Sequence, residues 1–338
     1  MNNCLGATDL TRTAALLTSW AQAHYGPSAA VDQVAPMPGH AGISFGFDVR
    51  SDSAEERLVI RVAPPGVRRS GPADVLRQVP VLQAAAVSGV PVAGVRWWSD
   101  DERWFGSPYF VVDRLPGSSL SCWEPLEETG SDADSIFAAA VDALAAIHRI
   151  DWRRQLSDWA EPRSLEAEIR AWEPVLRKGR NEAWIAFGLA LHEELLRTRP
   201  PEPAPAVVHG DFYSNNWVCQ DGKLLGVVDW EIAGIGAPLL DVGWLMMIYD
   251  PACWGPTRRP WMTWSPPPEQ LGDAYRSATG DRSPDLAWYQ GLACWRFAAI
   301  TAMNLHLHRS GNRPDETWEL IGEAFEPMVA RGLELARA

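Results

Sequence analysis

The spacing of hydrophobic and polar residues predicts a helix at the start of the chain, followed by a β-hairpin. Residues 8–25 carry an apolar stripe at helical spacing, and Thr8 and Asp9 are suited to cap the first turn. Residues 45–49 alternate between apolar and polar side chains. The apolar-rich residues 57–62 have the pattern of a second strand, and the polar stretch between the two predicts the hairpin turn.

A second helix and further strands are expected within the first third of the chain. Residues 74–88 have helical spacing, although Pro80 would kink that helix. Residues 90–92 and 95–98 suggest another strand, and residues 109–113 suggest one more. This part of the chain therefore resembles a small β-sheet with few helices.

The remainder of the chain is predicted to be mainly helical, with one β-rich insert at residues 207–230 and Pro-rich loops at 199–205 and 257–268. The expected helices are residues 135–150, 164–176, 183–197, 285–308 and 315–336. A small β-rich lobe followed by a larger helical lobe is an α+β fold, and a cleft between two lobes is a common place for a ligand.

Composition and charge narrow the classes of partner. Apolar residues make up 46% and charged residues 22% of the 338 residues, as is typical of a soluble globular protein. The formal net charge of -13 argues against nucleic acid and anionic membranes as partners. The 18 tryptophans are expected mostly in the core.

Cysteine usage and the N-terminal sequence indicate a cytoplasmic protein. The five cysteines include no CxxC pair, so we expect reduced thiols rather than disulfides or a structural zinc site. The first residues do not have the pattern of a secretion signal, and no apolar run is long enough to span a bilayer. The oligomeric state is not indicated.

The most informative segment is VVHGDFYSNNW at residues 207–217, followed by LLGVVDWE at residues 224–231. A hairpin between these segments would bring Asp211, Asn216 and Asp229 to one end of a small sheet. Two carboxylates and an amide oxygen suit Mg²⁺, which prefers oxygen ligands. Phosphoryl transfer requires such an ion on the phosphates and a carboxylate that orients the attacking hydroxyl.

HGDFYSNN followed by VVDWE resembles the aminoglycoside phosphotransferase and choline kinase family, which has a bilobal, protein-kinase-like fold. The resemblance implies that Asp211 is the catalytic base. It further implies that Asn216, five residues later, is a metal ligand and that Asp229 is the principal metal-binding carboxylate. His209 would hold the catalytic loop.

The resemblance also assigns supporting residues and lobes. Asp241 ends a segment, GAPLLD, that matches the family and would support the catalytic loop, and His148 would serve in packing or hydrogen bonding. Residues 1–115 would form the nucleotide-binding lobe, and residues 116–338 would form the helical lobe with the catalytic loop and the acceptor pocket.

Candidate nucleotide-binding residues lie in the first lobe. Glycines allow backbone N–H groups to approach phosphates closely, so Gly39, Gly42 and Ser44 are candidates for a phosphate-covering loop. Arg61 stands where the family carries its phosphate-binding cation. By the same resemblance, backbone groups of Asp113 and Leu115 would contact adenine.

One position departs from the family pattern. The helix glutamate that normally pairs with the phosphate-binding cation is replaced by Gln78, which supplies no charge. Asp74 or another carboxylate would have to pair with Arg61 instead.

The resemblance predicts a kinase that uses ATP or GTP with Mg²⁺ to phosphorylate a hydroxyl of a small molecule, such as an aminoglycoside, a sugar or an amino alcohol. The alternative is a non-catalytic nucleotide-binding module of the same fold. A protein kinase is disfavoured, because no HRD-type loop, DFG or APE motif is present. Tryptophans of the helical lobe are candidates for the acceptor pocket: Trp172, Trp184, Trp254, Trp261, Trp264, Trp288 and Trp295.

Overall fold

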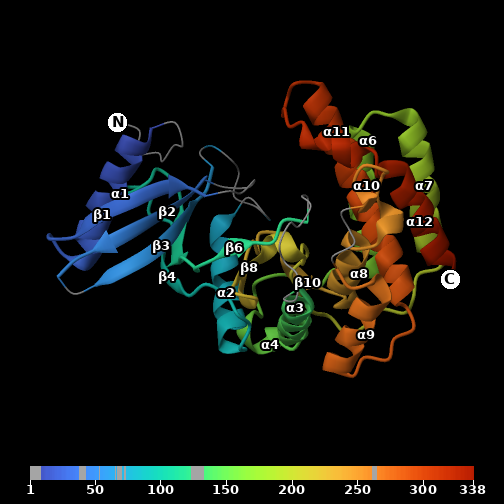
Figure 1. The fold of residues 1–338 in the computed structure, drawn as a ribbon, viewed down its shortest axis with the longest axis horizontal. Coiled ribbons are helices and arrows are strands. Elements are labelled where there is room, and N and C mark those ends of the chain that lie inside the picture. Colours follow the sequence, from blue (N-terminus) through green and yellow to red (C-terminus); the bar gives the residue numbers. More distant parts are fainter. Residues whose placement is uncertain are drawn as a thin grey trace. The chain divides into compact units, whose positions relative to one another are not determined.

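The computed structural model describes residues 9–37, 43–52, 54–64, 66, 71, 74–122, 133–260 and 265–338. They form two compact units, and each unit is described by itself (Figure 1). The first comprises residues 1–117, 152–159 and 225–233, and the second comprises 118–151, 160–224 and 234–338. Three residues singled out in the sequence, Thr8, Trp261 and Trp264, lie outside the described part.

The first unit is built on a five-stranded antiparallel sheet. Its order is β1 (Ala30–Pro36), β2 (Ile43–Arg50), β3 (Glu55–Val62), β5 (Tyr109–Asp113) and β4 (Val95–Ser99). Helix α1 (Leu10–Tyr25) covers one face, and the Asp9 carboxylate caps it by accepting the N–H of Arg12 (Figure 1). The predicted first helix and hairpin are therefore confirmed.

Side-chain alternation along β2 and β3 gives the sheet two different faces. Phe45, Phe47 and Ile60 are fully buried in a core with Trp20 of α1, whose indole N–H donates to the Tyr109 hydroxyl (2.9 Å). The intervening residues point to the other face of the sheet, because successive side chains of a strand alternate. That face carries Ser44 directly opposite Arg61.

The helix predicted over residues 74–88 begins differently from our expectation. A 3₁₀ turn, η2 (Val75–Arg77), is capped by the Asp74 carboxylate and leads into α2 (Gln78–Val87). Pro80 therefore lies in the first turn of α2, where its missing N–H removes no helical hydrogen bond, and no kink is needed.

The strand predicted from residues 90–92 and 95–98 is confirmed only in its second part, as β4, and residues 90–92 form no strand. The Pro91 carbonyl instead accepts the N–H of Val227 (2.8 Å), which ties residues 225–233 to the first unit. Trp159 follows α4 (Trp152–Gln155). The Arg77 guanidinium lies over its indole ring, 4.2 Å from the ring centroid of Trp159. Arg77 in turn donates to the Ala233 carbonyl (2.6 Å).

The second unit is mainly helical and is organised around α10 (Leu286–Arg309), which packs against α6, α7, α8 and α12 (Figure 1). Gly243 of α8 permits close approach to α10, because a Cβ there would lie 2.4 Å from the Tyr289 backbone. The other helices are α3 (Ala133–His148), α5 (Leu165–Ala171), α6 (Glu173–Lys178), α7 (Glu182–Arg197), α8 (Leu239–Ile248), α9 (Pro268–Thr279), α11 (Thr317–Gly322) and α12 (Phe325–Arg337).

Two predicted helices are each divided in two. Residues 164–176 form α5 and α6, and residues 315–336 form α11 and α12. In both cases the second helix has a proline, Pro174 or Pro327, in its first turn. Proline is tolerated there but disfavours continuation of the preceding helix.

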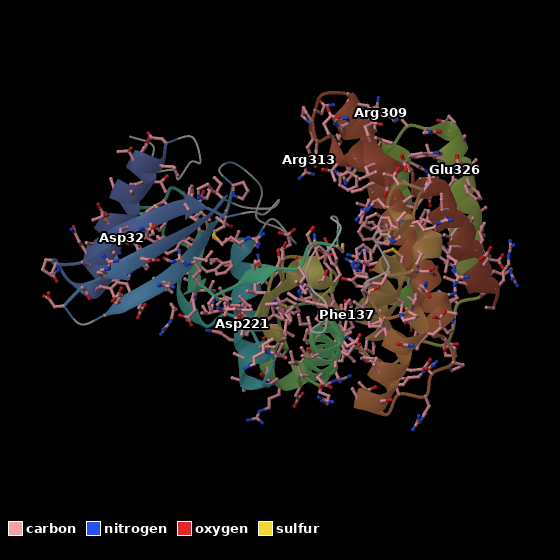
Figure 2. All side chains as sticks on the ribbon, viewed as in Figure 1. Asp32, Phe137, Asp221, Arg309, Arg313 and Glu326 are labelled. Carbon is pink, nitrogen blue, oxygen red and sulfur yellow. The ribbon has the colours of Figure 1, made fainter. Side chains whose placement is uncertain are left out.

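Short strands carry the residues of the predicted hairpin. β7 (Ala206–Val208) pairs with β10 (Gly234–Gly236), and β8 (Trp217–Gln220) lies between β6 (Ser118–Ser119) and β9 (Lys223–Val227). The turn from β8 to β9 is at Asp221, which adopts a left-handed backbone (φ 49°; labelled in Figure 2). Phe137 of α3, also labelled there, packs edge-on against Trp217 (5.3 Å between ring centroids).

The predicted α+β fold, with a small antiparallel sheet followed by a larger helical unit, is confirmed. Fewer than half of the described tryptophans are buried, so the expectation that they lie mostly in the core is not met. The buried ones are Trp20, Trp217, Trp230, Trp244, Trp254, Trp288 and Trp295. Within the described ranges, no helix is both long enough and apolar enough to cross a lipid bilayer.

Candidate active site

The catalytic-loop candidate begins at His209, directly after β7, and is held by the buried carboxylate of Asp241. The two Asp241 oxygens accept the backbone N–H groups of His209 and Gly210, each at 2.7 Å. Gly210 has a left-handed backbone (φ 84°), which favours glycine at this position. The Nδ1 atom of His209 accepts the N–H of Asp211 (3.2 Å), so the turn before the candidate base is fixed from both sides.

Asp241 is itself supported from α3 and α9. Its carboxylate contacts Nε2 of His148 (3.1 Å), and Nδ1 of His148 contacts the Tyr275 hydroxyl (2.7 Å). Burial raises the pKa of Asp241, but the hydrogen bond and charge of His148, the charge of His209 and the Gly210 N–H together outweigh burial, and the pKa is lowered overall. The loop-supporting role predicted for Asp241 and the hydrogen-bonding role predicted for His148 are confirmed.

Asp211 and Asn216 are joined by a direct interaction. The amide nitrogen of Asn216 donates to the backbone carbonyl (2.8 Å) and to the carboxylate (3.0 Å) of Asp211. The amide oxygen of Asn216 therefore faces away from Asp211 and makes no hydrogen bond to a described residue. An amide oxygen oriented in this way is a suitable ligand for a hard cation.

The far side of the catalytic loop is braced by residues that the sequence did not suggest. The side-chain oxygen of Asn215 accepts the N–H of Cys122 (2.9 Å). Of the two adjacent asparagines, Asn216 is therefore the better candidate for a metal ligand. The Cys122 carbonyl accepts from Arg258 (2.9 Å), whose guanidinium lies 4.6 Å from the Trp254 ring centroid. Burial lowers the pKa of Arg258 to about 10.

Arg61 forms the centre of a charged network in the first unit. It donates to the carboxylates of Asp229 (3.1 Å) and Glu231 (2.5 Å). The Arg61 side chain is 14% exposed and that of Glu231 is 18% exposed. The carboxylates that pair with Arg61 are therefore those of Asp229 and Glu231 in the DWE segment, whereas the Asp74 carboxylate caps η2.

The segment that carries Asp229 is anchored to the first unit. Asp229 has a left-handed backbone (φ 63°), a conformation that aspartate tolerates better than most residues. The Trp230 indole is buried and donates to the Val227 carbonyl (3.0 Å). A Cβ on Gly226 would lie 2.3 Å from the Leu115 side chain, so the glycine lets this segment pass close to Leu115.

The other predicted nucleotide-binding residues are placed as follows. Asp113 ends β5, and its carboxylate pairs with Arg96 (2.7 Å). The backbone N–H of Leu115 makes no hydrogen bond to a described residue. Gly39 and Gly42 lie outside the described residues.

The predicted site residues thus occur in both units. Asp211 and Asn216 belong to the second unit, whereas Arg61 and Asp229 belong to the first. Each pair is in place within its own unit, and the convergence of the two pairs on one metal ion and one nucleotide stays a prediction.

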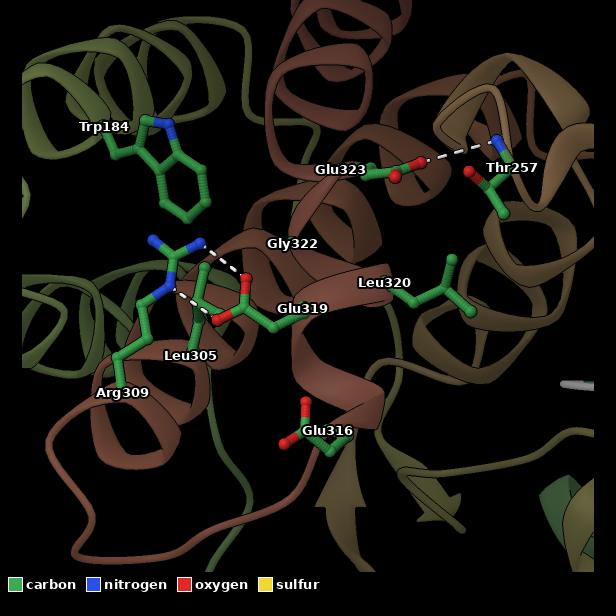
Figure 3. A pocket seen from close by; sticks show the side chains of 9 residues that line it. All are labelled: Trp184, Thr257, Leu305, Arg309, Glu316, Glu319, Leu320, Gly322 and Glu323. Atoms are coloured by element: carbon green, nitrogen blue, oxygen red, sulfur yellow. Dashed lines mark hydrogen bonds and ion pairs between the residues drawn. The ribbon is translucent and has the colours of Figure 1, made fainter.

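The second unit also contains a cavity of about 640 Å³ between α7, α10 and α11 (Figure 3). Arg309 and Glu319 form a two-bonded ion pair there (2.7 and 2.6 Å), and Trp184 stacks on Phe325. The cavity is lined by Trp184, Thr257, Leu305, Arg309, Glu316, Glu319, Leu320, Gly322 and Glu323.

Thr257 connects this cavity to the catalytic loop within the second unit. Its N–H approaches the Glu323 carboxylate (3.4 Å), and the next residue, Arg258, is hydrogen-bonded to Cys122. Cys122 in turn binds Asn215. Trp184 was among the tryptophans proposed for an acceptor pocket, and the structure places it in the wall of the cavity.

Known proteins resemble this chain over most of its length. A solved structure of a putative aminoglycoside phosphotransferase from Ralstonia eutropha superposes with a TM-score of 0.77 at 22% identity, covering 96% of this chain and 98% of that one. A thermostable mutant of aminoglycoside phosphotransferase APH(4)-Ia, in ternary complex with AMP-PNP and hygromycin B, gives 0.58 at 17% identity, covering 95% and 97%. At these identities the likeness shows the fold.

Curated relatives are longer proteins. Acyl-CoA dehydrogenase family member 11 of Mus musculus is 22% identical over 306 residues, which cover 83% of this chain but only 38% of that protein. The chain spans well under half of the length of the first curated relatives that it matches.

The model of the phosphotransferase enzyme family matches residues 39–297, which include the HGD loop and the DWE segment. The resemblance inferred from these motifs is thereby confirmed, and the chain belongs to the phosphotransferase enzyme family.

Proposed function

We propose that this protein transfers the γ-phosphoryl group of ATP, with Mg²⁺, to a hydroxyl group of a small molecule. The observation that carries the proposal is the Asp211–Asn216 pair. The amide of Asn216 fixes the Asp211 carboxylate while leaving its own oxygen for a cation. A base and a metal ligand in this relation are the elements that phosphoryl transfer requires.

Asp211 would orient the acceptor hydroxyl and accept its proton. Asn216 and Asp229 would hold Mg²⁺, which neutralises charge on the β- and γ-phosphates. Asp241 and His148 would act indirectly, because they fix the backbone from which Asp211 projects. Positioning and charge neutralisation supply most of the rate enhancement in such sites.

The nucleotide would be held by the first unit. Arg61 would bind the phosphates. Its ion pair with Asp229 would then be replaced by a contact with the nucleotide, while its ion pair with Glu231 would remain. Ser44, opposite Arg61 on the same face of the sheet, would lie beside it, with Gly39 and Gly42 in the preceding loop. The unengaged N–H of Leu115 would donate to adenine, and the carbonyl of Asp113 would accept from it.

The acceptor would bind in the second unit, and the cavity between α7, α10 and α11 is its candidate pocket. The ring of Trp184 offers a flat wall, and Glu316 and Glu323 offer carboxylates for hydroxyl or amine groups. Hygromycin B bound to the APH(4)-Ia mutant makes a polyhydroxylated amine a reasonable first class to test.

The test is a coupled ADP-release screen with Mg-ATP and Mg-GTP across aminoglycosides, sugars, amino alcohols and nucleosides. Activity that appears with one acceptor class and disappears in Asp211→Ala supports the proposal. If calorimetry shows that ATP binds but no acceptor in the panel is phosphorylated, the result favours the alternative, a non-catalytic nucleotide-binding module. Turnover that survives in Asp211→Ala contradicts the assignment of the base.

A further inference from the structure

A second candidate binding site is centred on Arg296, in the middle of α10. Its guanidinium lies between two indole rings, 4.9 Å from the ring centroid of Trp172 and 4.6 Å from that of Trp244. Trp172 lies between α5 and α6, and Trp244 belongs to α8. Three segments of the second unit therefore hold one cation in a fixed position.

Arg296 has donors but no acceptor within the described part of the protein. None of its N–H groups makes a hydrogen bond or ion pair there, although its Nε atom is buried. The indole N–H of Trp244, a residue only 3% exposed, is also buried without a partner. Buried donors are costly when unsatisfied, and both groups can only donate, so each of them lacks an acceptor.

The nearby carboxylate of Glu168 does not fill this role. Its two oxygens accept from the Trp172 indole and from Arg163, each at 2.9 Å. Burial would raise the pKa of Glu168, but the positive charge of Arg296 and these hydrogen bonds lower it overall. Two guanidinium groups thus face one carboxylate, and the cluster retains a positive charge.

Arg296 is connected to the catalytic loop through α8. Trp244 follows Asp241 by three residues, which is about one helical turn. Asp241 holds the backbone of His209 and Gly210. A group bound between Arg296 and Trp244 would therefore lie against α8, the helix that also carries Asp241.

We propose that Arg296, flanked by Trp172 and Trp244, binds an anionic oxygen group, a carboxylate or a phosphate, of a small molecule. The anionic group belongs either to the acceptor or to a separate small anion. If the anionic group is part of the acceptor, the inference rests on the proposed phosphotransferase function. If it is a separate small anion, the inference does not depend on that function. An acceptor with an anionic group would differ in charge from the polyhydroxylated amines considered above.

The primary test is calorimetric titration of the full chain with inorganic phosphate and with acetate. It is performed in an Arg61→Gln background, so that the proposed nucleotide site does not contribute. We expect saturable binding of at least one probe. Adding Arg296→Gln should weaken binding about tenfold or more, since charge-assisted bonds to an oxyanion are lost. Arg296→Lys, which keeps the charge, should lose less.

The matched control is Arg177→Gln, which removes an exposed arginine of α6 that pairs with Glu173. It should leave the titration unchanged. Trp244→Phe keeps an aromatic ring but removes the buried N–H, so it should weaken binding by a smaller factor. Circular dichroism and thermal unfolding of each variant identify any loss of fold, and Trp244→Phe and Arg296→Lys keep the test valid if Arg296→Gln is unstable.

Binding that is equal in the parent and in Arg296→Gln, or absent from the parent, overturns the proposal. Kinetics with an identified acceptor then distinguish the source. A raised acceptor KM in Arg296→Gln, with an unchanged KM for ATP, indicates a group of the acceptor, whereas an unchanged acceptor KM indicates a separate anion. If no acceptor in the panel is phosphorylated and anion binding still depends on Arg296, this site stands independently of the phosphotransferase proposal.

Discussion

Glu231 is expected to hold Arg61 in the place of the helix glutamate that Gln78 replaces, and Glu231→Gln tests this. The Glu231–Arg61 distance is 2.5 Å, and both side chains are mostly buried. Removing one partner of a fully buried ion pair costs about 3–5 kcal/mol. Here Asp229 still pairs with Arg61 and both groups retain some exposure, so we expect a loss of about 1–2 kcal/mol in unfolding free energy.

The interaction itself is measured with a double-mutant cycle of Glu231→Gln and Arg61→Gln in urea unfolding. We expect a coupling energy of about 1–2 kcal/mol between the two positions. The exposed pair of Arg50 and Glu55 provides the control, because an exposed pair contributes little. In steady-state kinetics, Glu231→Gln should raise the KM for ATP about tenfold, the equivalent of 1.4 kcal/mol. No coupling, together with an unchanged KM, would refute this role of Glu231.

Four further predictions concern the catalytic loop and the packing below it. Asp211→Asn should lower transfer by a factor of about 10³ or more while a fluorescent ATP analogue still binds, and near-normal transfer would refute its role as base. Asp241→Asn should lower the unfolding free energy by about 3 kcal/mol, because one of two buried N–H groups then faces an amide N–H; an unchanged urea midpoint would contradict this. The pKa of Asp241 is lowered in the folded protein, so its contribution to stability is complete above the unfolded-state pKa, about 4, and is lost as pH falls through the folded value. The unfolding free energy of the wild type should therefore fall more steeply with decreasing pH than that of Asp241→Asn. Parallel plots of unfolding free energy against pH would contradict this role of Asp241. Gly243→Ala should cost about 1–3 kcal/mol from overpacking against Tyr289, whereas Gly234→Ala, whose Cβ would meet nothing, should cost little; equal effects would contradict the packing argument.

Local patterns were sufficient for most helices and for the central hairpin, because burial of one face leaves a clear periodicity in α1, β2 and β3. β1 was missed for a physical reason. It is an edge strand with mostly exposed side chains, and its regular alternation is interrupted at Gln33, which has a left-handed backbone (φ 53°). Residues 90–92 resembled a strand by composition, but the Pro91 carbonyl pairs with a residue far along the chain.

The candidate chemistry was readable from the sequence because the HGD loop and the DWE segment are each contiguous. Their supports were not readable, because they come from distant positions. Glu231 is 170 residues from Arg61, and Arg258 is 136 residues from Cys122. Gln78 was the one signal in the sequence that Arg61 pairs with a carboxylate elsewhere, because the resemblance implies a glutamate at that position. Glu231, the last residue of the DWE segment, was the candidate that a known motif offered.

Transfer of the γ-phosphate to an acceptor is tested most directly by following the γ-phosphate of ATP by ³¹P NMR in the presence of Mg²⁺ and the best acceptor from the screen. We predict that the γ-resonance is replaced by that of a phosphate monoester of the acceptor. Monoester formation should be slower by a factor of about 10³ or more in Asp211→Asn and strongly reduced in Asp229→Asn. Release of inorganic phosphate alone, or monoester formation at a near-normal rate in either variant, would contradict the assignment of this chain as a small-molecule phosphotransferase that uses these residues.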